Sequence, residues 1–187
     1  MTMASRLAMT TAEVTSEPKR SDFEAIFQAN FRFVCASLQR LGVRERDVED
    51  VAQELFVVVH RKLDSYDDQR PVHLWLFGFC LRAASDYRRL ARNRRLVHTD
   101  VEPAHPDLLA DDKIAAEQNR RLLLAALDEL DSDRREVFVM HDLNEFSSPQ
   151  IAEMLSIPVN TVYSRLRMAR EELKRAVTRL RASRGSK

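Results

Sequence analysis

Apolar residues recur every three or four positions along most of this chain, the spacing that places side chains on one face of an α-helix. The first such stripe occupies 23–41. It is preceded by Ser21 and Glu24 at capping-box spacing and followed by Gly42, a residue that commonly ends helices. A second stripe predicts a helix over about 45–63.

The next stretch, 71–95, changes character halfway along. Pro71 suits the first turn of a helix, and residues 74–81 are apolar on nearly every side, which predicts a buried segment. Five arginines follow in 88–95. Because an unpaired charge is costly to bury, this half should face water or an anion.

The second half of the chain also has helical periodicity. Ser147 and Gln150 form another capping box, and Pro158 prevents the preceding helix from continuing through the turn. The predicted helices cover about 114–130, 133–142, 147–155 and 160–181. Since we find no strand pattern, the expected fold class is all-α.

A polar stretch with Pro103, Pro106 and several acids separates the two helical groups, which predicts a flexible linker. We therefore expect two small helical domains on a loose tether. The expected boundaries are 1–20 for an N-terminal tail, 21–96 for the first domain, 97–113 for an acidic linker, 114–182 for the second domain and 183–187 for a tail.

The formal net charge of +1 conceals an uneven distribution. Residues 82–95 hold six Arg and one acid, and 159–187 hold nine Lys or Arg and two acids. Residues 99–118, by contrast, hold six acids and one Lys. This sorting predicts two basic surfaces and an acidic connector.

Several classes of protein are disfavoured. The longest apolar run, 72–84, is too short to cross a bilayer, and 1–20 lacks a signal-peptide core. Cys35 and Cys80 lie far apart without metal-ligand spacing, as in reduced cytosolic proteins. No nucleophile–base group or Gly-rich phosphate loop is recognisable. We expect a cytoplasmic protein that is not an enzyme and needs neither cofactor nor metal.

The strongest local signal is 150–170, which has the pattern of a helix-turn-helix, a unit whose second helix enters the DNA major groove. That helix offers neutral polar groups and guanidinium forks suited to base edges and phosphates. An amphipathic helix with a solvated basic face would show a similar pattern. The candidate residues are Asn160, Thr161, Tyr163, Ser164, Arg165, Arg167 and Arg170.

Three stretches resemble conserved regions of the sigma-70 family, specifically its extracytoplasmic-function group. RDVEDVAQELFVVVHRKL (46–63) and LWLFGFCLRAASDYRRLARNRR (74–95) resemble successive helices of region 2. The segment 127–173, which contains IPVNTVYSRL (157–166), resembles region 4. The resemblance implies a transcription initiation factor that binds core RNA polymerase, recognises −10 and −35 promoter elements and assists DNA melting.

The resemblance also implies roles for individual positions. The surface that docks on the polymerase would comprise Asp47, Glu49, Asp50, Gln53, Glu54 and Phe56, with Phe56 either an anchor or a core residue. The −10 element would be bound by Tyr66, Arg70, Arg82, Ser85, Asp86, Arg88 and Arg89, and the −35 element by the helix-turn-helix residues. Acids 47–54 and arginines 88–95 could also be ordinary solvated surfaces.

Implied partners are core RNA polymerase through its β′ clamp and β flap, promoter DNA, and an anti-sigma factor, often membrane-anchored, whereas this chain is not itself in the membrane. The chain departs from the family pattern at three positions. Arg82 replaces a common Asn, Gly78 replaces a bulkier residue inside a helix, and Ser156 replaces the usual Gly of the turn.

Two other classes of function fit parts of the pattern. An ordinary repressor or activator would bind duplex DNA as a homodimer without polymerase. An adaptor that contacts only proteins would have no affinity for promoter DNA, and the basic helix over 160–181 argues against it.

Overall fold

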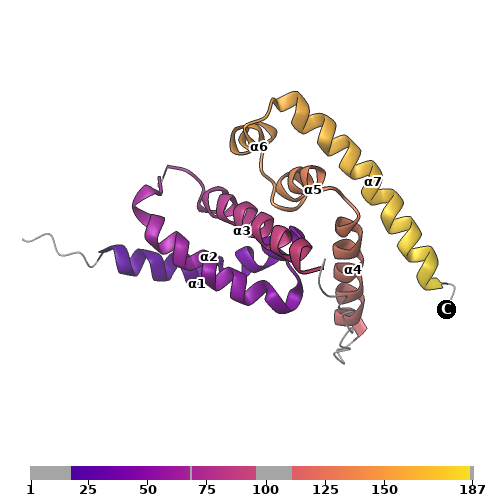
Figure 1. The fold of residues 1–187 in the computed structure, drawn as a ribbon, viewed down its shortest axis with the longest axis horizontal. Coiled ribbons are helices and arrows are strands. Elements are labelled where there is room, and N and C mark those ends of the chain that lie inside the picture. The colour runs from indigo at the N-terminus through magenta and orange to yellow at the C-terminus, as the bar shows by residue number, and fades with distance from the viewer. Residues whose placement is uncertain (1–17, 68, 96–110, 186–187) are drawn as a thin grey trace, which may run out of the picture.

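The computed structural model describes residues 18–67, 69–95 and 111–185, and every regular element in these ranges is helical (Figure 1). This confirms the expected all-α class. The α-helices are α1 (Pro18–Arg40), α2 (Val48–Lys62), α3 (Val72–Arg95), α4 (Asp111–Asp128), α5 (Ser132–Phe138), α6 (Ser148–Leu155) and α7 (Val159–Gly185). Short turns η1 (Glu45–Asp47) and η2 (Leu63–Ser65) flank α2, and a π-helical turn, η3 (Val139–Leu143), extends α5.

Three helix ends differ from the prediction. The first helix begins at Pro18, so Ser21 lies inside it and does not cap it. Proline favours the first turn because its missing N–H would have no helical partner there. Helix α4 begins at Asp111, before the expected 114, and α7 continues to Gly185, past the expected 181. Most of the predicted N-terminal tail and linker lies outside the described residues.

The first body consists of α1, α2 and α3. The apolar first half of α3 is buried only in part: Leu76, Phe77 and Cys80 are fully inaccessible, whereas Leu74, Trp75, Phe79 and Leu81 are half-buried. Rings from α1 and α2 form an aromatic cluster in which Phe56 lies 4.8 Å from Phe27, centroid to centroid, in an edge-on arrangement.

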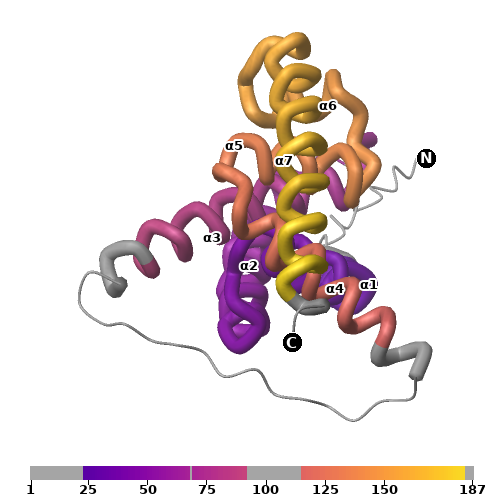
Figure 2. The backbone as a smooth tube through the Cα atoms, turned by 90° about the vertical axis from the view of Figure 1, so that its right-hand side faces the viewer, coloured from indigo at the N-terminus to yellow at the C-terminus, as the bar shows by residue number. Residues whose placement is uncertain are grey.

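The second body consists of α4, α5, α6 and α7, with α7 as the long helix against which the others pack (Figures 1 and 2). Ile151 of α6 and Val162 and Ala169 of α7 are fully buried, so one face of α7 supplies the core. The opposite face is left for other contacts.

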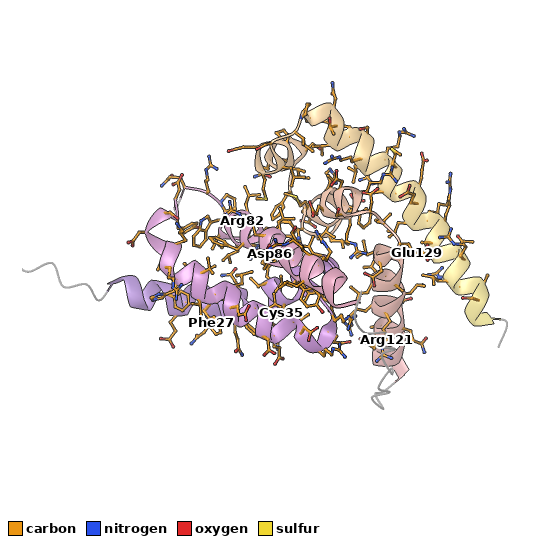
Figure 3. All side chains as sticks on the ribbon, in the orientation of Figure 1. Phe27, Cys35, Arg82, Asp86, Arg121 and Glu129 are labelled. Carbon is orange, nitrogen blue, oxygen red and sulfur yellow. The ribbon has the colours of Figure 1, made fainter. Side chains whose placement is uncertain are left out.

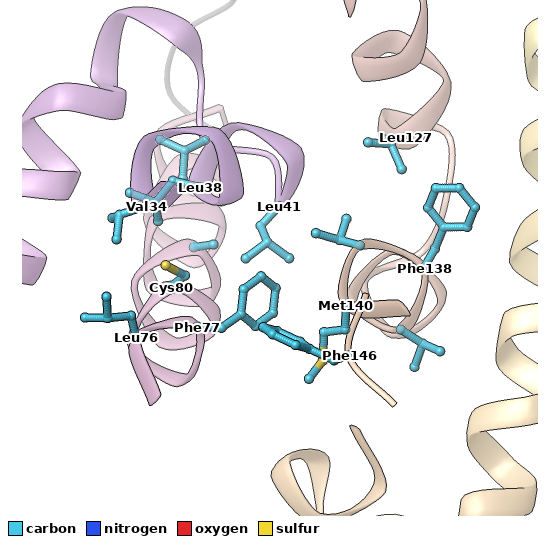
Figure 4. Close-up of a cluster of buried hydrophobic side chains, with 14 of the residues drawn as sticks. Val34, Leu38, Leu41, Leu76, Phe77, Cys80, Leu127, Phe138, Met140 and Phe146 are labelled. Atoms are coloured by element: carbon cyan, nitrogen blue, oxygen red, sulfur yellow. The ribbon is translucent and has the colours of Figure 1, made fainter. Parts of the chain in front are cut away.

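The two bodies pack against each other. Figure 4 shows Leu41 and Phe77 of the first body facing Met140 and Phe146 of the second. The rings of Phe77 and Phe146 meet edge to face with centroids 5.4 Å apart, and the buried apolar residues of both bodies form one continuous cluster. The sequence predicts two separate bodies. Periodicity identifies the apolar face of each helix but does not indicate which faces pack together, so it does not predict this contact.

Candidate nucleic-acid interface

The helix-turn-helix is present where the sequence predicted it. The Ser147 side chain caps α6, and Gln150 returns a side-chain contact, completing the predicted capping box. Ser156 then adopts a left-handed conformation, φ 54°, which ends α6. After Pro158, helix α7 begins, and its buried residues hold it against α6.

The predicted reading residues lie on the first turns of α7. Tyr163 is 55% exposed, an unusual fraction for a large aromatic side chain. Thr161 and Arg165 are half-buried. The exposed members of the set are Asn160, Tyr163, Ser164, Arg167 and Arg170. The chain therefore presents a polar, basic helix face with an aromatic ring at its centre.

Two arginines of this face are held by acids of their own body. Arg170 contacts Asp142 through both prongs of its guanidinium, with Nε–Oδ2 at 2.8 Å and Nη2–Oδ1 at 2.6 Å. This bidentate contact lowers the pKa of Asp142. Arg165 forms an ion pair with Asp133 of α5. Sequence reasoning missed both acids, because they lie about 30 residues before their partners and no local pattern links them.

The acid-bearing face of α2 is also on the surface. Glu49, Asp50, Gln53 and Glu54 are exposed, whereas Asp47 is half-buried and accepts a hydrogen bond from the Tyr87 hydroxyl. Phe56 is only 2% exposed and sits in the aromatic cluster, which makes it a core residue and not an anchor.

Sequence reasoning missed an apolar patch beside these acids. Val57 and Val58 are 52% and 45% exposed. A groove of about 430 Å³ lies next to Val57. It is lined by Phe23, Phe27, Gln53, Phe56, Val57, His60 and Arg61. Three successive valines, 57–59, on a helix that can bury only one face were the available signal.

The residues expected at the −10 element gather along one side of α3 and in the loop before it. The Tyr66 ring lies 4.8 Å from that of Trp75, and its hydroxyl donates to the Arg70 carbonyl at 3.0 Å. Arg82, Ser85, Asp86 and Arg89 are exposed on α3, where Arg89 pairs with Asp86 at 3.1 Å (Figure 3 labels Arg82 and Asp86).

Arg70 and Arg88 reach the other body instead. Arg88 Nη2 lies 2.9 Å from Glu136 Oε1 of α5, with side chains 20% and 18% exposed, and Nη1 donates to the Leu41 carbonyl at 2.6 Å. Arg70 Nη1 lies 3.2 Å from Glu153 Oε1 of α6. Arg88 therefore faces an anion, as predicted for this basic segment, and the anion is the Glu136 carboxylate of the same chain.

Other chemistry finds little support. None of the helices in the described ranges is long and apolar enough to cross a bilayer. Within 18–67, 69–95 and 111–185 no cluster of three or more His, Cys, Asp or Glu side chains could hold a metal. Cys35 and Cys80 are free thiols, and burial raises the pKa of Cys80 to about 12, which makes it unreactive near neutral pH.

Comparison with known families agrees with this geometry. Residues 26–95 match the family described as Sigma-70 region 2, and residues 120–173 match Sigma-70, region 4. The RNA polymerase sigma factor CnrH of Cupriavidus metallidurans is 34% identical over 141 residues, covering 71% of this chain and 74% of CnrH. The ECF RNA polymerase sigma-E factor of Escherichia coli K12 is 28% identical over 149 residues, covering 74% of this chain and 78% of that protein.

Solved structures show the same arrangement of helices. CnrH in complex with the cytosolic domain of CnrY superposes with a TM-score of 0.62 at 27% identity, covering 85% of this chain and 89% of the CnrH chain. The sigma factor RpoE in complex with the anti-sigma factor NepR from Bartonella quintana has a TM-score of 0.65 at 21% identity, covering 84% of this chain and 98% of that chain. The latter supports the fold alone.

Proposed function

Because this chain belongs to the extracytoplasmic-function group of the sigma-70 family of transcription initiation factors, we propose that it binds core RNA polymerase and directs it to promoters through the −10 and −35 elements. The observation that carries the proposal is the exposed polar face of α7, which combines hydrogen-bonding side chains, an aromatic ring and three arginines. Each half of the chain would contribute one stretch of DNA contact.

The second body would read the −35 element. Placing the start of α7 in the major groove brings Asn160 and Ser164 near base edges, while arginine forks suit guanine or phosphate. The pairing of Arg170 with Asp142 holds its guanidinium in one orientation before DNA arrives, so less side-chain freedom is lost on binding.

The first body would bind and help open the −10 element. An unpaired base needs a stacking surface, and the adjoining rings of Tyr66 and Trp75 offer one beside the exposed polar side of α3. Arginines along α3 would hold the strand backbone through contacts that weaken as salt rises.

Docking on the polymerase would use the exposed face of α2. The acids Asp50 and Glu54 suit a basic partner helix, and Val57 beside them adds apolar area that a partner can cover. We further propose an anti-sigma partner, since the related CnrH is solved in complex with the cytosolic domain of CnrY.

Run-off transcription with purified core polymerase tests this assignment. We expect promoter-specific transcripts only when the chain is present. Arg165→Ala should reduce transcription while leaving core binding unchanged, whereas Asp50→Arg should weaken core binding itself. If both variants lose core binding equally, the division of labour is wrong. Homodimeric binding to duplex DNA without transcript stimulation would identify a repressor instead.

A further inference from the structure

A cleft of about 440 Å³ lies between the two bodies, and its walls carry an excess of positive charge. Arg44 and Arg88 line it from the first body, and Arg135 lines it from the second. Among the lining residues that the structure describes, Asp128 is the single acid. Because like charges gathered around a concave surface concentrate counter-ions there, this cleft attracts anions.

The three guanidinium groups differ in how far their charge is neutralised. Arg88 pairs with Glu136, with Nη2 and Oε1 2.9 Å apart. Arg135 Nη2 lies 2.9 Å from Asp128 Oδ1, but the Asp128 side chain is 69% exposed, so water weakens this pair. Arg44 is half-buried and forms no ion pair with any residue in the described ranges. The cleft therefore keeps positive charge that the described part of the chain does not balance.

Arg135 gives a second, independent observation. Its side chain is only 7% exposed, and its Nε is buried without a hydrogen-bond partner among the described residues. A buried donor that is left unpaired is destabilising. Burial also lowers the pKa of Arg135, and the neighbouring charge of Arg88 lowers it as well. An anion in the cleft would offset both the burial of this charge and its repulsion by Arg88.

We propose that this cleft binds a small phosphorylated molecule, with Arg44 and Arg135 holding its phosphate from opposite bodies. A phosphate group carries a charge of about −1.5 to −2 at neutral pH and has several acceptor oxygens, which suits more than one guanidinium fork. The Tyr87 ring and the Leu130 side chain offer an apolar wall for the organic part of the ligand. The volume of the cleft falls within the range of about 300–1,000 Å³ that is typical of small-molecule sites.

The burial of Arg135 favours a small ligand over a nucleic-acid backbone. Proteins hold single strands with exposed cations along an open groove, whereas the Arg135 guanidinium lies almost entirely inside the protein. Arg44 and Arg135 are also absent from the surfaces proposed above for DNA and for polymerase. The inference therefore goes beyond the proposed function and does not depend on it.

The first test is isothermal titration calorimetry of the full chain with inorganic pyrophosphate, at constant ionic strength and without DNA or polymerase. We expect one site on the wild-type chain. Arg44→Gln should weaken the affinity by about tenfold to a hundredfold, because it removes a charge-assisted hydrogen bond. The matched control is Arg46→Gln, which removes the same charge two residues away, at an exposed side chain outside the cleft. It should weaken the affinity by less than about threefold.

A second pair of variants should change the affinity in the opposite direction. Asp128→Asn removes the acid of the cleft and should tighten pyrophosphate binding by up to about fivefold. Glu129→Gln removes the neighbouring acid, which lies outside the cleft and pairs with Arg179, and should have little effect. If Arg44→Gln does not fold, this pair still tests the site, because the Asp128 side chain is 69% exposed and contributes nothing to the core.

Three results would overturn the site. The first is neither heat of binding nor a rise in the thermal unfolding midpoint of the wild-type chain at millimolar pyrophosphate. The second is an equal loss of affinity in Arg44→Gln and Arg46→Gln, which would indicate attraction by surface charge in general. The third is a wild-type chain that binds a single-stranded oligonucleotide but not pyrophosphate, with Arg44→Gln weakening the oligonucleotide, which would assign the cleft to DNA. Transcription with core polymerase tests the proposed function separately.

Discussion

The arginines of α7 and two arginines of the first body, Arg70 and Arg88, are the same kind of side chain, yet they pair with acids in different places. Arg165 and Arg170 pair with Asp133 and Asp142, within the second body. Arg88 pairs with Glu136 across the contact between the bodies, and Arg70 pairs with Glu153 across it as well as with Asp67 of its own body. One basic surface is organised locally, and the other depends on where its neighbouring body lies.

This difference decides how each surface can be controlled. Acids within the same body orient the α7 arginines in any arrangement of the two halves. Acids in the other body contact Arg70 and Arg88 only while the halves touch, so a movement of one body would change the surroundings of these two arginines and leave the α7 pairs as they are. The same physical interaction thus organises one basic surface within its own body and ties part of the other to the contact between the bodies.

The largest effect should come from the apolar contact that joins the bodies. Phe77→Ala and Phe146→Ala each remove a buried ring, and each should lower the free energy of unfolding by about 3–5 kcal/mol. Because the rings touch, the double variant should lose less than the sum, by about 0.5–1.5 kcal/mol. Urea unfolding measures all three.

A control pair keeps this cycle interpretable. Val59→Ala on α2 and Val162→Ala on α7 each remove two methyl groups from the core of one body. Their reductions in the free energy of unfolding should add within about 0.5 kcal/mol. If the phenylalanine losses add equally well, the bodies are not coupled through this contact, and the comparison drawn above fails.

The second prediction compares the two kinds of arginine directly. Arg170→Ala should weaken binding to −35 duplex DNA by about 1–3 kcal/mol. The loss should be the same in the wild-type background and in the Glu136→Gln, Glu153→Gln background, since Arg170 is organised within its own body. Electrophoretic mobility shifts at fixed salt measure it.

Arg88→Ala should behave in the opposite way with single-stranded −10 DNA. In the wild-type background its effect should be smaller, because the Arg88 side chain is only 20% exposed beside Glu136. In the Glu136→Gln, Glu153→Gln background it should cost about 1–3 kcal/mol. Equal losses in both backgrounds would mean that Glu136 does not compete with DNA.

The sequence was sufficient to predict most of the helices but not how the helices of the two bodies pack together. Capping at Ser147 and the turn at Pro158 are local, so the helix-turn-helix could be located within a residue or two. The contact of Phe77 with Phe146 is not local: nothing in the periodicity of α3 indicates that a residue 69 positions later completes its core.

The same limit applies to the candidate site. Exposure of Asp50, Tyr163 and Arg167 follows from their places on amphipathic helices, and each was anticipated. Arg88 was expected to face water or an anion, which holds, but its partner comes from another helix. The sequence does not decide between core and surface for Phe56, because an apolar residue at the edge of a helix can serve either role; the neighbouring helix places it in the core.

The third prediction concerns one unusual residue in each body. Gly78 lies inside α3 with nothing within 4 Å of an added Cβ, so Gly78→Ala should stabilise the chain by about 1 kcal/mol. Ser156 occupies the left-handed region, so Ser156→Gly should also stabilise it, by about 1 kcal/mol. Replacing a glycine in α3 and introducing one at the end of α6 should thus both stabilise the chain. Thermal unfolding measures both changes.

Gly42→Ala is the informative contrast. Gly42 has φ +98°, and an added Cβ would lie 2.3 Å from Arg135 Nη1 of the second body, so this change should destabilise the chain and push the bodies apart. A stabilising Gly42→Ala would mean that the Arg135 contact is absent in solution.

The smallest effect, less than about 1 kcal/mol for each pair, should appear in the pH dependence of stability. Arg170 lowers the pKa of Asp142 in the folded chain, so the unfolded chain binds more protons just below the ordinary carboxyl pKa, and this pair's stability is lost as pH falls through the folded value. Burial raises the pKa of Glu136, so the folded chain binds more protons just above the ordinary value, and stability falls as pH rises there. Urea unfolding from acid to neutral pH should therefore show Asp142→Asn removing a rise and Glu136→Gln removing a decline. Two slopes of the same sign would contradict this assignment, in which Arg170 stabilises the ionised form of Asp142 within one body and burial at the contact between the bodies destabilises the ionised form of Glu136.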